Sequence, residues 1–368
     1  MKKLLSIVLI LAISVFAFVG CTQDQPEVPE TPVVEEPKVE EPVVEEPVVE
    51  EPKVEEPLAE GAVKTGLAVV SSIEKSKDAG EKDGTAQTDS VIVAVTVDKD
   101  GKIVQTVIDT AQTKIAFSAE GKVLTDLSTV FASKQELKEE YGMHKASTLD
   151  KEWYEQANAL SAYIVGKTVE EVKGIAVDET GVPTEADLVS SVTIKINPYK
   201  EAIEKAVANA QNLGAEASDK LGLGVVTTIS KSKDATADAE GVAQAYTTYT
   251  AATFDADGKV TSSIIDASQA NVKFDAAGKI TTDLTVAPET KVELGEGYGM
   301  KKASAIGKEW YEQADAFAAY VVGKPVEEIK GIAVDVTSHA TSEALVSSVT
   351  VGIEDFQSNL EKAFNNAQ

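Results

Sequence analysis

Most of this chain is an internal duplication. The segment Lys151–Ala157 recurs as Lys308–Ala314, 157 positions later. Further segments recur at the same spacing, and an earlier one recurs at a spacing of 156. A period this long with only two copies indicates a pair of related domains and not a solenoid. We place the two repeats at 61–211 and 212–368. The other matching segments are Gly174–Asp178 with Gly331–Asp335, Leu188–Thr193 with Leu345–Thr350, Tyr141–Met143 with Tyr298–Met300, and Ser76–Ala79 with Ser232–Ala235.

The first half of each repeat predicts antiparallel strands. Residues Val91–Val97 are rich in β-branched side chains, and Asp98–Gly101 then predicts a turn into Lys102–Ile108. Asp255–Gly258 stands at the same place in the second repeat. The Asp-x-Asp-Gly sequence of these two segments also resembles the start of a calcium loop. It lacks the further ligands and the distal Glu of an EF-hand, so a plain turn is favoured. Further hairpin turns are predicted at 120–122 and 277–279.

The second half of each repeat predicts helices. Trp153, Ala157, Leu160 and Ile164 are spaced by four, three and four residues, which places them on one face of a helix. Strands followed by helices indicate an α+β fold, with an antiparallel sheet followed by helices in each repeat. The remaining predicted features are a twin stripe at Trp310, Ala314, Phe317 and Val321, N-caps at Asp150 and Gly307, a strand or turn at Leu188–Thr193, and closing helices at Tyr199–Ala210 and Phe356–Ala367.

The first residues resemble a bacterial lipoprotein export signal. Two Lys residues precede the apolar run Leu4–Val19, as the positive and apolar regions of a signal peptide do. The one Cys in the chain, Cys21, follows at once, and Phe18–Cys21 resembles a lipobox. This resemblance implies removal of a signal peptide at 1–20 and a lipid on the Cys21 thiol, which anchors the chain to the outer face of the cell membrane. Two acyl chains suffice for stable anchoring. An uncleaved anchor or an incidental Cys is the alternative.

Residues 21–60 predict a disordered, Pro/Glu-rich linker. The unit Val-Val-Glu-Glu-Pro recurs there, and eight of the twelve Pro residues lie within it. Pro at every fifth position prevents helices and sheet ladders, and the repelling carboxylates extend the chain. At roughly 3.1 Å per residue the linker can reach on the order of 100 Å. We interpret it as a stalk, with cell-wall binding as the less favoured alternative.

The composition excludes several classes of function. The chain has 61 acidic residues against 34 basic ones, all of them Lys, and a formal net charge of −27. Binding to a phosphate backbone needs a basic face, so we expect no nucleic-acid partner. One Cys cannot form an internal disulfide or a thiolate zinc site, and two His cannot build a His-rich metal centre. His144 is replaced by Lys301 in the second repeat, which argues against a shared Ser–His pair, and no Gly-rich phosphate loop is present.

One recurring element carries several hydroxyl groups. In the first repeat it comprises Asp187, Ser190, Ser191 and Thr193, and Ala344 stands at the position of Asp187 in the second. Taken alone, these residues favour a β-strand with its hydroxyls on the polar face. The corresponding hydroxyl residues of the second repeat are Ser347, Ser348 and Thr350.

This element resembles the covalent flavinylation motif of FMN-binding domains. In that motif an Asp is followed by Ser or Thr, two small residues, and a Thr or Ser that carries FMN through a phosphoester. An FMN transferase of the ApbE type adds the flavin. The order of lipobox, stalk and two related domains resembles PplA-like flavolipoproteins over essentially the full chain. The resemblance implies that Thr193 and Thr350 carry FMN, with Asp187 as the acidic residue. Ser191-Val192 stands where the family often has Gly-Ala.

Aromatic, Met and Gln side chains recur in both copies and are candidates for contact with the flavin. Gln156 and Gln313 are candidates for hydrogen bonds to the edge of the ring. For the Trp and Tyr residues, ordinary core packing on a helical stripe is the favoured alternative. The candidate ring-packing residues are Trp153, Tyr141, Met143, Trp310, Tyr298 and Met300.

The resemblance implies a membrane-anchored electron carrier and not an enzyme with its own substrate pocket. Electrons would pass from the membrane quinone pool to FMN and then to extracellular acceptors such as ferric iron. Covalent attachment suits a protein outside the cell, because a dissociable cofactor would be lost by dilution. The alternative is a flavin-free surface lipoprotein whose paired domains bind a ligand or a cell-wall component. With either function, the resemblance implies that Ile13–Gly20 of the signal peptide can serve as a peptide pheromone.

Overall fold

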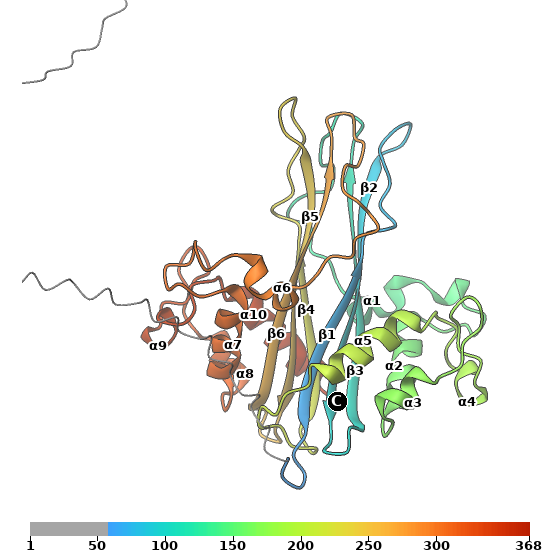
Figure 1. The fold of residues 1–368 in the computed structure, drawn as a ribbon, viewed down its shortest axis with the longest axis vertical. Coiled ribbons are helices and arrows are strands. Elements are labelled where there is room, and N and C mark those ends of the chain that lie inside the picture. The colour runs from blue at the N-terminus through green and yellow to red at the C-terminus, as the bar shows by residue number, and fades with distance from the viewer. Residues whose placement is uncertain (1–57) are drawn as a thin grey trace, which may run out of the picture. The chain divides into compact units, whose positions relative to one another are not determined.

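The computed structural model describes residues 58–368, which lie within one compact unit that holds both repeats (Figure 1). The predicted signal peptide, the lipidation site Cys21 and nearly all of the predicted linker lie outside the described residues. Among residues 58–368, no helix has the length and apolar character needed to cross a membrane.

Each repeat contributes one three-stranded antiparallel sheet, in the order β1-β2-β3 and β4-β5-β6. The predicted strand at Val91–Val97 is confirmed, but it begins earlier, because the polar stretch from Gly84 pairs with β3 throughout. A register irregularity at Thr96/Val97 recurs at Thr253/Phe254. The strands are β1 (Lys64–Ser72), β2 (Gly84–Val97), β3 (Ile103–Phe117), β4 (Lys220–Thr228), β5 (Gly241–Phe254) and β6 (Val260–Phe274).

The Asp-x-Asp-Gly segments form turns, as predicted. Asp98 Oδ1 accepts hydrogen bonds from the backbone N–H groups of Asp100 and Lys102, both at 2.9 Å. Gly101 has a φ of 75°, a left-handed conformation that costs little without a Cβ. Asp255 makes the same two contacts in the second repeat. The acidic side chain therefore stabilises the turn between two strands.

Four helices of twelve or thirteen residues cover the sheets, and the predicted apolar stripe on α2 is buried. The predicted N-caps Asp150 and Gly307 are wrong: Glu152 and Glu309 occupy this position and form capping boxes. The predicted closing helices are confirmed as α5 and α10. The helices are α1 (Lys134–Leu137), η1 (Lys138–Tyr141), η2 (His144–Ala146), α2 (Trp153–Ile164), α3 (Val169–Lys173), α4 (Ala186–Val189), α5 (Asn197–Ala208), α6 (Lys291–Leu294), η3 (Gly295–Tyr298), α7 (Trp310–Val321), α8 (Val326–Lys330), α9 (Glu343–Val346) and α10 (Glu354–Asn366).

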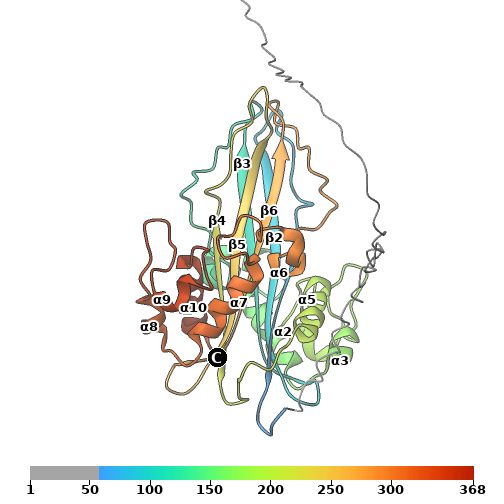
Figure 2. The same cartoon turned by 60° about the vertical axis from the view of Figure 1, so that its left-hand side comes forward.

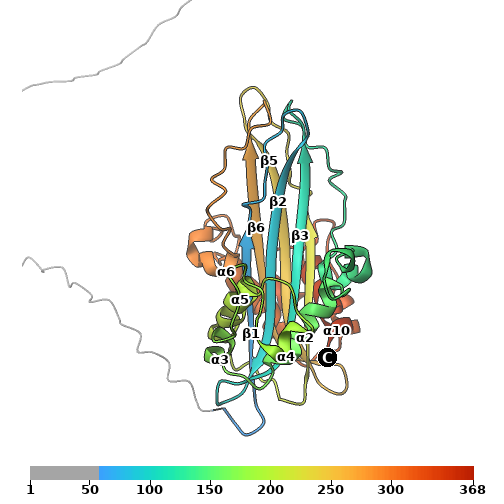
Figure 3. The same cartoon turned by 90° about the vertical axis from the view of Figure 1, so that its right-hand side faces the viewer.

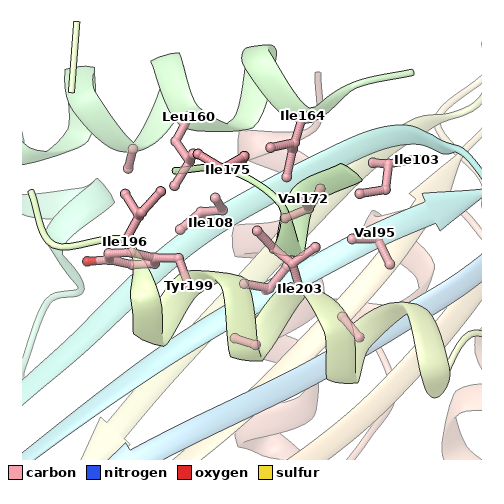
Figure 4. Close-up of a cluster of buried hydrophobic side chains, with 14 of the residues drawn as sticks. Val95, Ile103, Ile108, Leu160, Ile164, Val172, Ile175, Ile196, Tyr199 and Ile203 are labelled. Carbon is pink, nitrogen blue, oxygen red and sulfur yellow. The ribbon is translucent and has the colours of Figure 1, made fainter. Parts of the chain in front are cut away.

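The elements of residues 58–368 form four layers: helices, sheet, sheet and helices (Figures 1 and 3). On β2, Val93 and Val95 face the helices of their own repeat, where they join a cluster beneath α2 and α5 (Figure 4). The alternate residues Ile92 and Ala94 face the second sheet and pack with Leu223. Where the helices cover a sheet, both of its faces are therefore buried, one against the helices and the other against the opposite repeat.

The two repeats exchange reciprocal contacts at one end of the sheets, where their turns lie side by side (Figure 2). The Phe117 and Phe274 rings stack with centroids 4.3 Å apart. Asp78 Oδ1 accepts from the backbone N–H of Ile280 at 2.7 Å, and Asp234 Oδ1 accepts from that of Val123 at 2.8 Å. The recurring Ser-Lys-Asp-Ala segment thus joins each repeat to the turn of the other.

Gly222 should be sensitive to any added side chain, because α10 crosses β4 directly above it. A Cβ on Gly222 would lie 1.9 Å from the backbone oxygen of Ala363. We expect Gly222→Ala to lower the free energy of unfolding by about 1–3 kcal/mol, the usual cost of overpacking. Urea titration followed by circular dichroism measures this. Gly297→Ala, where a Cβ meets no atom within 4 Å, is the matched control. Equal midpoints for the two variants would contradict the close helix–strand packing.

Candidate functional site

The hydroxyl-bearing segment of the first repeat forms a short helix and then a turn at Ser190 and Ser191. The predicted strand is therefore wrong, whereas the alternative prediction of a turn is confirmed for these two residues. Leu188 and Val192 are four residues apart, and both side chains are buried in the core. The Ser191 hydroxyl donates to the backbone oxygen of Leu188 at 3.2 Å. Because Val192 points inward, its bulk does not cover the protein surface beside Thr193. Asp187 and Ser190 are exposed, whereas Thr193 is half-buried.

The second repeat reproduces this turn. Val349 is buried, Ser347 is exposed, and the Ser348 hydroxyl donates to the backbone oxygen of Leu345 at 3.3 Å. Thr350 is half-buried like its counterpart. The exposed Ala344 replaces Asp187, so the two turns differ in charge but not in backbone course.

A buried glutamine holds each threonine. Gln156 Oε1 accepts from the Thr193 N–H at 2.7 Å, the Thr193 hydroxyl at 3.2 Å and the Ile194 N–H at 3.2 Å. Its Nε2 donates to Ser147 Oγ at 3.1 Å and to the Lys151 backbone oxygen at 3.3 Å. The structure thus brings two residues together that the sequence assigned to one site. Since the amide is already engaged, a hydrogen bond to a flavin ring would require it to exchange a partner.

Gln313 makes the equivalent contacts in the second repeat. Its Oε1 accepts from the N–H of Thr350 at 2.7 Å and from the hydroxyl at 3.1 Å. Its Nε2 donates to Ser304 Oγ and to the Lys308 backbone oxygen, both at 3.2 Å. Each amide therefore joins the start of a long helix to the threonine turn, which lies 37 residues further along the chain.

The two tryptophans lie in the hydrophobic cores. Trp153 is 2% exposed, and its indole N–H donates to the Tyr199 hydroxyl at 3.0 Å. Trp310 is equally buried, with its ring edge-on to Phe356 at a centroid distance of 5.9 Å. These positions fit the core-packing interpretation, and they leave little indole surface for a ligand.

Tyr141, Tyr298, Met143 and Met300 are half-buried at the edges of the two cores. Glu152, which is 3% exposed, holds Met143 by accepting from its backbone N–H at 2.7 Å, and it also bonds the His144 ring. Glu309 holds Met300 in the same way at 2.8 Å. The sequence interpretation missed these two carboxylates. Their presence in the duplicated Lys-Glu-Trp segment was the available signal.

A buried lysine lies beside the aromatic residues of each repeat, and it too was missed. Lys291 Nζ lies 4.5, 4.6 and 4.7 Å from the ring centroids of Tyr298, Tyr246 and Trp310. In the first repeat Lys134 Nζ lies 4.5 Å from Tyr141 and 5.3 Å from Trp153. A cation over aromatic faces is stabilised by the ring quadrupoles. Burial lowers the pKa of Lys291 to about 8, although nearby Asp266 opposes that shift.

Each sheet also buries one aspartate. Asp266 Oδ1 accepts from the N–H groups of Ala267 at 2.7 Å and Val292 at 3.1 Å, and Asp109 makes the equivalent contacts in the first repeat. Burial raises the pKa of Asp109 to about 6 and that of Asp266 to about 7. Within residues 58–368, no group of three or more His, Cys, Asp or Glu side chains is arranged to hold a metal ion.

Removing the buried amide should loosen the threonine turn. We expect Gln156→Leu to lower the free energy of unfolding by about 1–3 kcal/mol, because the Thr193 and Ile194 N–H groups lose their acceptor in a buried place. Chemical denaturation measures the change. Asn158→Leu is the control. Asn158 is exposed on the same helix and accepts one solvent-exposed hydrogen bond, from Gln135, so its replacement should change stability by no more than about 0.5 kcal/mol. A cost no greater than that of the control would contradict the role assigned to Gln156.

The buried Asp266 should make folding depend on pH. Its carboxyl ionises near pH 4 in an unfolded chain but near pH 7 in the folded one, so the folded protein binds more protons between these values. Its contribution to stability is complete below pH 4 and is lost as the pH rises through 7. Asp266→Asn cannot ionise and should gain stability relative to the parent chain over this interval, by up to about 4 kcal/mol.

Urea titrations of both chains at pH 4.5, 6 and 8 measure that difference. Exposed Asp257→Asn is the control, and its difference from the parent chain should not change with pH in this way. An Asp266→Asn difference that is the same at all three values would show that the carboxyl is not buried as described.

Comparison with known proteins adds one partial similarity. A chlorophenol reductase of Desulfitobacterium hafniense is 48% identical over 42 residues, which is 11% of this chain and 13% of that protein. The match therefore spans far less than two thirds of that relative. No family model matches the chain, and no solved structure matches it.

Proposed function

We propose that this chain is a membrane-anchored extracellular electron carrier with FMN attached covalently to Thr193, Thr350 or both. The observation that carries the proposal is the contact between a half-buried threonine and a fully buried glutamine, present in both repeats. The lipid anchor is Cys21, and the linker 21–60 provides the reach from the membrane.

The threonine contact suits attack on phosphorus. The Thr193 hydroxyl donates a hydrogen bond to Gln156 Oε1, so the lone pairs of the hydroxyl oxygen are directed away from the amide. An amide oxygen is no base at neutral pH, so the transferase has to supply one. Thr193 would hold FMN through a phosphoester. Its oxygen would bond to the flavin phosphorus of a nucleotide donor as the other nucleotide departs with its phosphate, and its proton would pass to the base of the transferase.

The surroundings of Thr193 fit a phosphoester in two respects. Val192 is buried and leaves the adjacent surface to the small side chains of Ser190 and Ser191. The Thr193 backbone N–H is already bonded to Gln156, which fixes the threonine in place before and after attachment. The exposed Asp187 supplies the acidic position of the motif in the first repeat, whereas Ala344 does not in the second. Thr193 is therefore the stronger attachment site.

When bound, FMN supplies one- and two-electron chemistry, which allows a quinol donor to be linked to one-electron acceptors. The chain contributes position: a threonine turn fixed by Gln156 of α2, and a lipid anchor with a long linker. In the proposed relay the membrane quinone pool is the donor, and extracellular acceptors such as ferric iron receive the electrons.

A flavin-free surface lipoprotein with ligand-binding domains is the second candidate. It is favoured by the internal contacts of Trp153 and Gln156, which leave these candidate flavin contacts engaged within the fold. In that case the threonine–glutamine contacts serve stability alone.

Co-expression with an FMN transferase distinguishes the two candidates. We expect the purified chain to be yellow and to carry one or two flavin-phosphate adducts by intact mass. Thr193→Ala should remove one adduct, and Thr350→Ala should remove the other where a second is present. Thr184→Ala and Thr341→Ala are matched controls, since these exposed threonines are also related by the duplication. A colourless chain without adducts would refute the flavin proposal and leave the second candidate.

A further inference from the structure

A pocket of about 630 Å³ opens on the second repeat and belongs to neither threonine turn. The upper parts of the strands extend beyond the helices, as Figures 1 and 3 show. Val242, Gln244 and Tyr246 alternate along β5 and line the pocket, together with Gln269 and Asn271 on β6. The residues between them face the opposite sheet. A volume of this size is typical of sites for small molecules.

The pocket gathers positive charge in a chain that is strongly acidic. Lys231, Lys233 and Lys273 lie at its wall, and Lys291 lies at its aromatic side, against one carboxylate, Asp355. Lys273 has Glu240 at 3.8 Å. In the part of the chain that the structure describes, Lys231 and Lys233 have no carboxylate within ion-pair distance. Their charges are available to a ligand.

The buried side chain of Lys291 adds a further positive charge to the pocket lining. Lys291 is 4% exposed, and its Nζ donates to the Tyr246 hydroxyl at 3.1 Å. Among the described residues no carboxylate lies within 4 Å of this Nζ, and the rings of Tyr246 and Tyr298 surround it instead. Tyr246 and Tyr298 both line the pocket beside it. The site therefore combines cations with aromatic and amide side chains, a set that suits an anion with an apolar body.

The first repeat lacks this arrangement. It differs at several of the lining positions, and Asp89 in place of Tyr246 is the difference that engages a lysine. Tyr246 pairs with Thr228 and Gln269 across the sheet, and Asp89 pairs with Ser72 and Gln112 at the matching register. Asp89 binds Lys75 at 2.8 Å. It also accepts from Gln87 at 2.8 Å and from Gln112 at 2.7 Å. An internal carboxylate thus engages Lys75, whereas the equivalent Lys231 has no carboxylate within ion-pair distance in the described residues. The amides of the second repeat bond within the pocket wall, Gln244 to Asn271 at 2.9 Å and Gln269 to Tyr298 at 3.4 Å.

We propose that the second repeat binds a small organic anion in this pocket, an aromatic phosphate, sulfonate or carboxylate, and that the first repeat does not. Lys231 and Lys233 contact the anionic group. Tyr246, Tyr298 and Val242 contact the apolar body. Tyr298 is also one of the candidate flavin contacts, but Lys231, Lys233 and Tyr246 are not, and none of these residues belongs to the threonine turns. The proposal therefore does not depend on flavin attachment.

Isothermal titration of the full chain, produced without an FMN transferase, tests this with 1-naphthyl phosphate as the probe. We expect one site per chain, weaker binding in higher salt, and binding of uncharged 1-naphthol at least about tenfold weaker, or ~1.4 kcal/mol. The double variant Lys231→Gln/Lys233→Gln should weaken the probe by about tenfold or more. Lys75→Gln/Lys77→Gln, the same change in the first repeat, should leave affinity within about twofold.

Tyr246→Asp introduces the residue of the first repeat and should also abolish binding, with folding checked by thermal melting. The two lysine pairs are exposed, so their comparison remains decisive if Tyr246→Asp does not fold. Three results would each overturn the proposal: no heat of binding at millimolar probe, equal affinity for 1-naphthol, or equal losses from the two lysine pairs.

Discussion

The contact between the two sheets supports the rest of this fold. Side chains alternate along every strand, so a sheet with apolar side chains on both faces has two faces to bury. Helices of the same repeat cover one face, and only the other repeat covers the second, through residues such as Ile92 and Leu223. Because the inner faces are occupied in this way, the threonine turns and the lysine-lined pocket both lie on the outer side, with the helices.

The sequence predicts those parts of the fold that local periodicity determines. The stripe on α2 and the core of β2 follow from spacings of four, three and two. The start of β2 does not, since Thr85, Gln87 and Asp89 are poor evidence for a strand, and their pairing with β3 overrides that local preference. Local periodicity also does not predict which surface packs against each sheet, because contacts such as Phe117 with Phe274 join residues far apart in the chain.

The errors at the candidate site also have physical causes. The hydroxyl groups of this segment favour the polar face of a strand, but Leu188 and Val192 are four residues apart and both side chains are buried, which is the spacing of one helical turn. Glu152 is an unusual N-cap residue. Its carboxylate also accepts a hydrogen bond from the Met143 N–H, a contact that no capping rule predicts. Gln156 and Thr193 could be assigned to one site from their recurrence, but no local rule predicts that they touch.

The two repeats can be compared to distinguish features that stability explains from features that need a functional explanation. Gln156 and Gln313 satisfy backbone groups in both repeats, so stability alone is enough to keep them. The exchange of Asp89 for Tyr246 has no such explanation. The two side chains occupy equivalent registers of the two related sheets, yet Asp89 neutralises a lysine and Tyr246 leaves Lys231 without an ion-pair partner in the described residues. An unpaired lysine cluster adds little to stability, and its occurrence in one repeat alone is the stronger indication of a ligand.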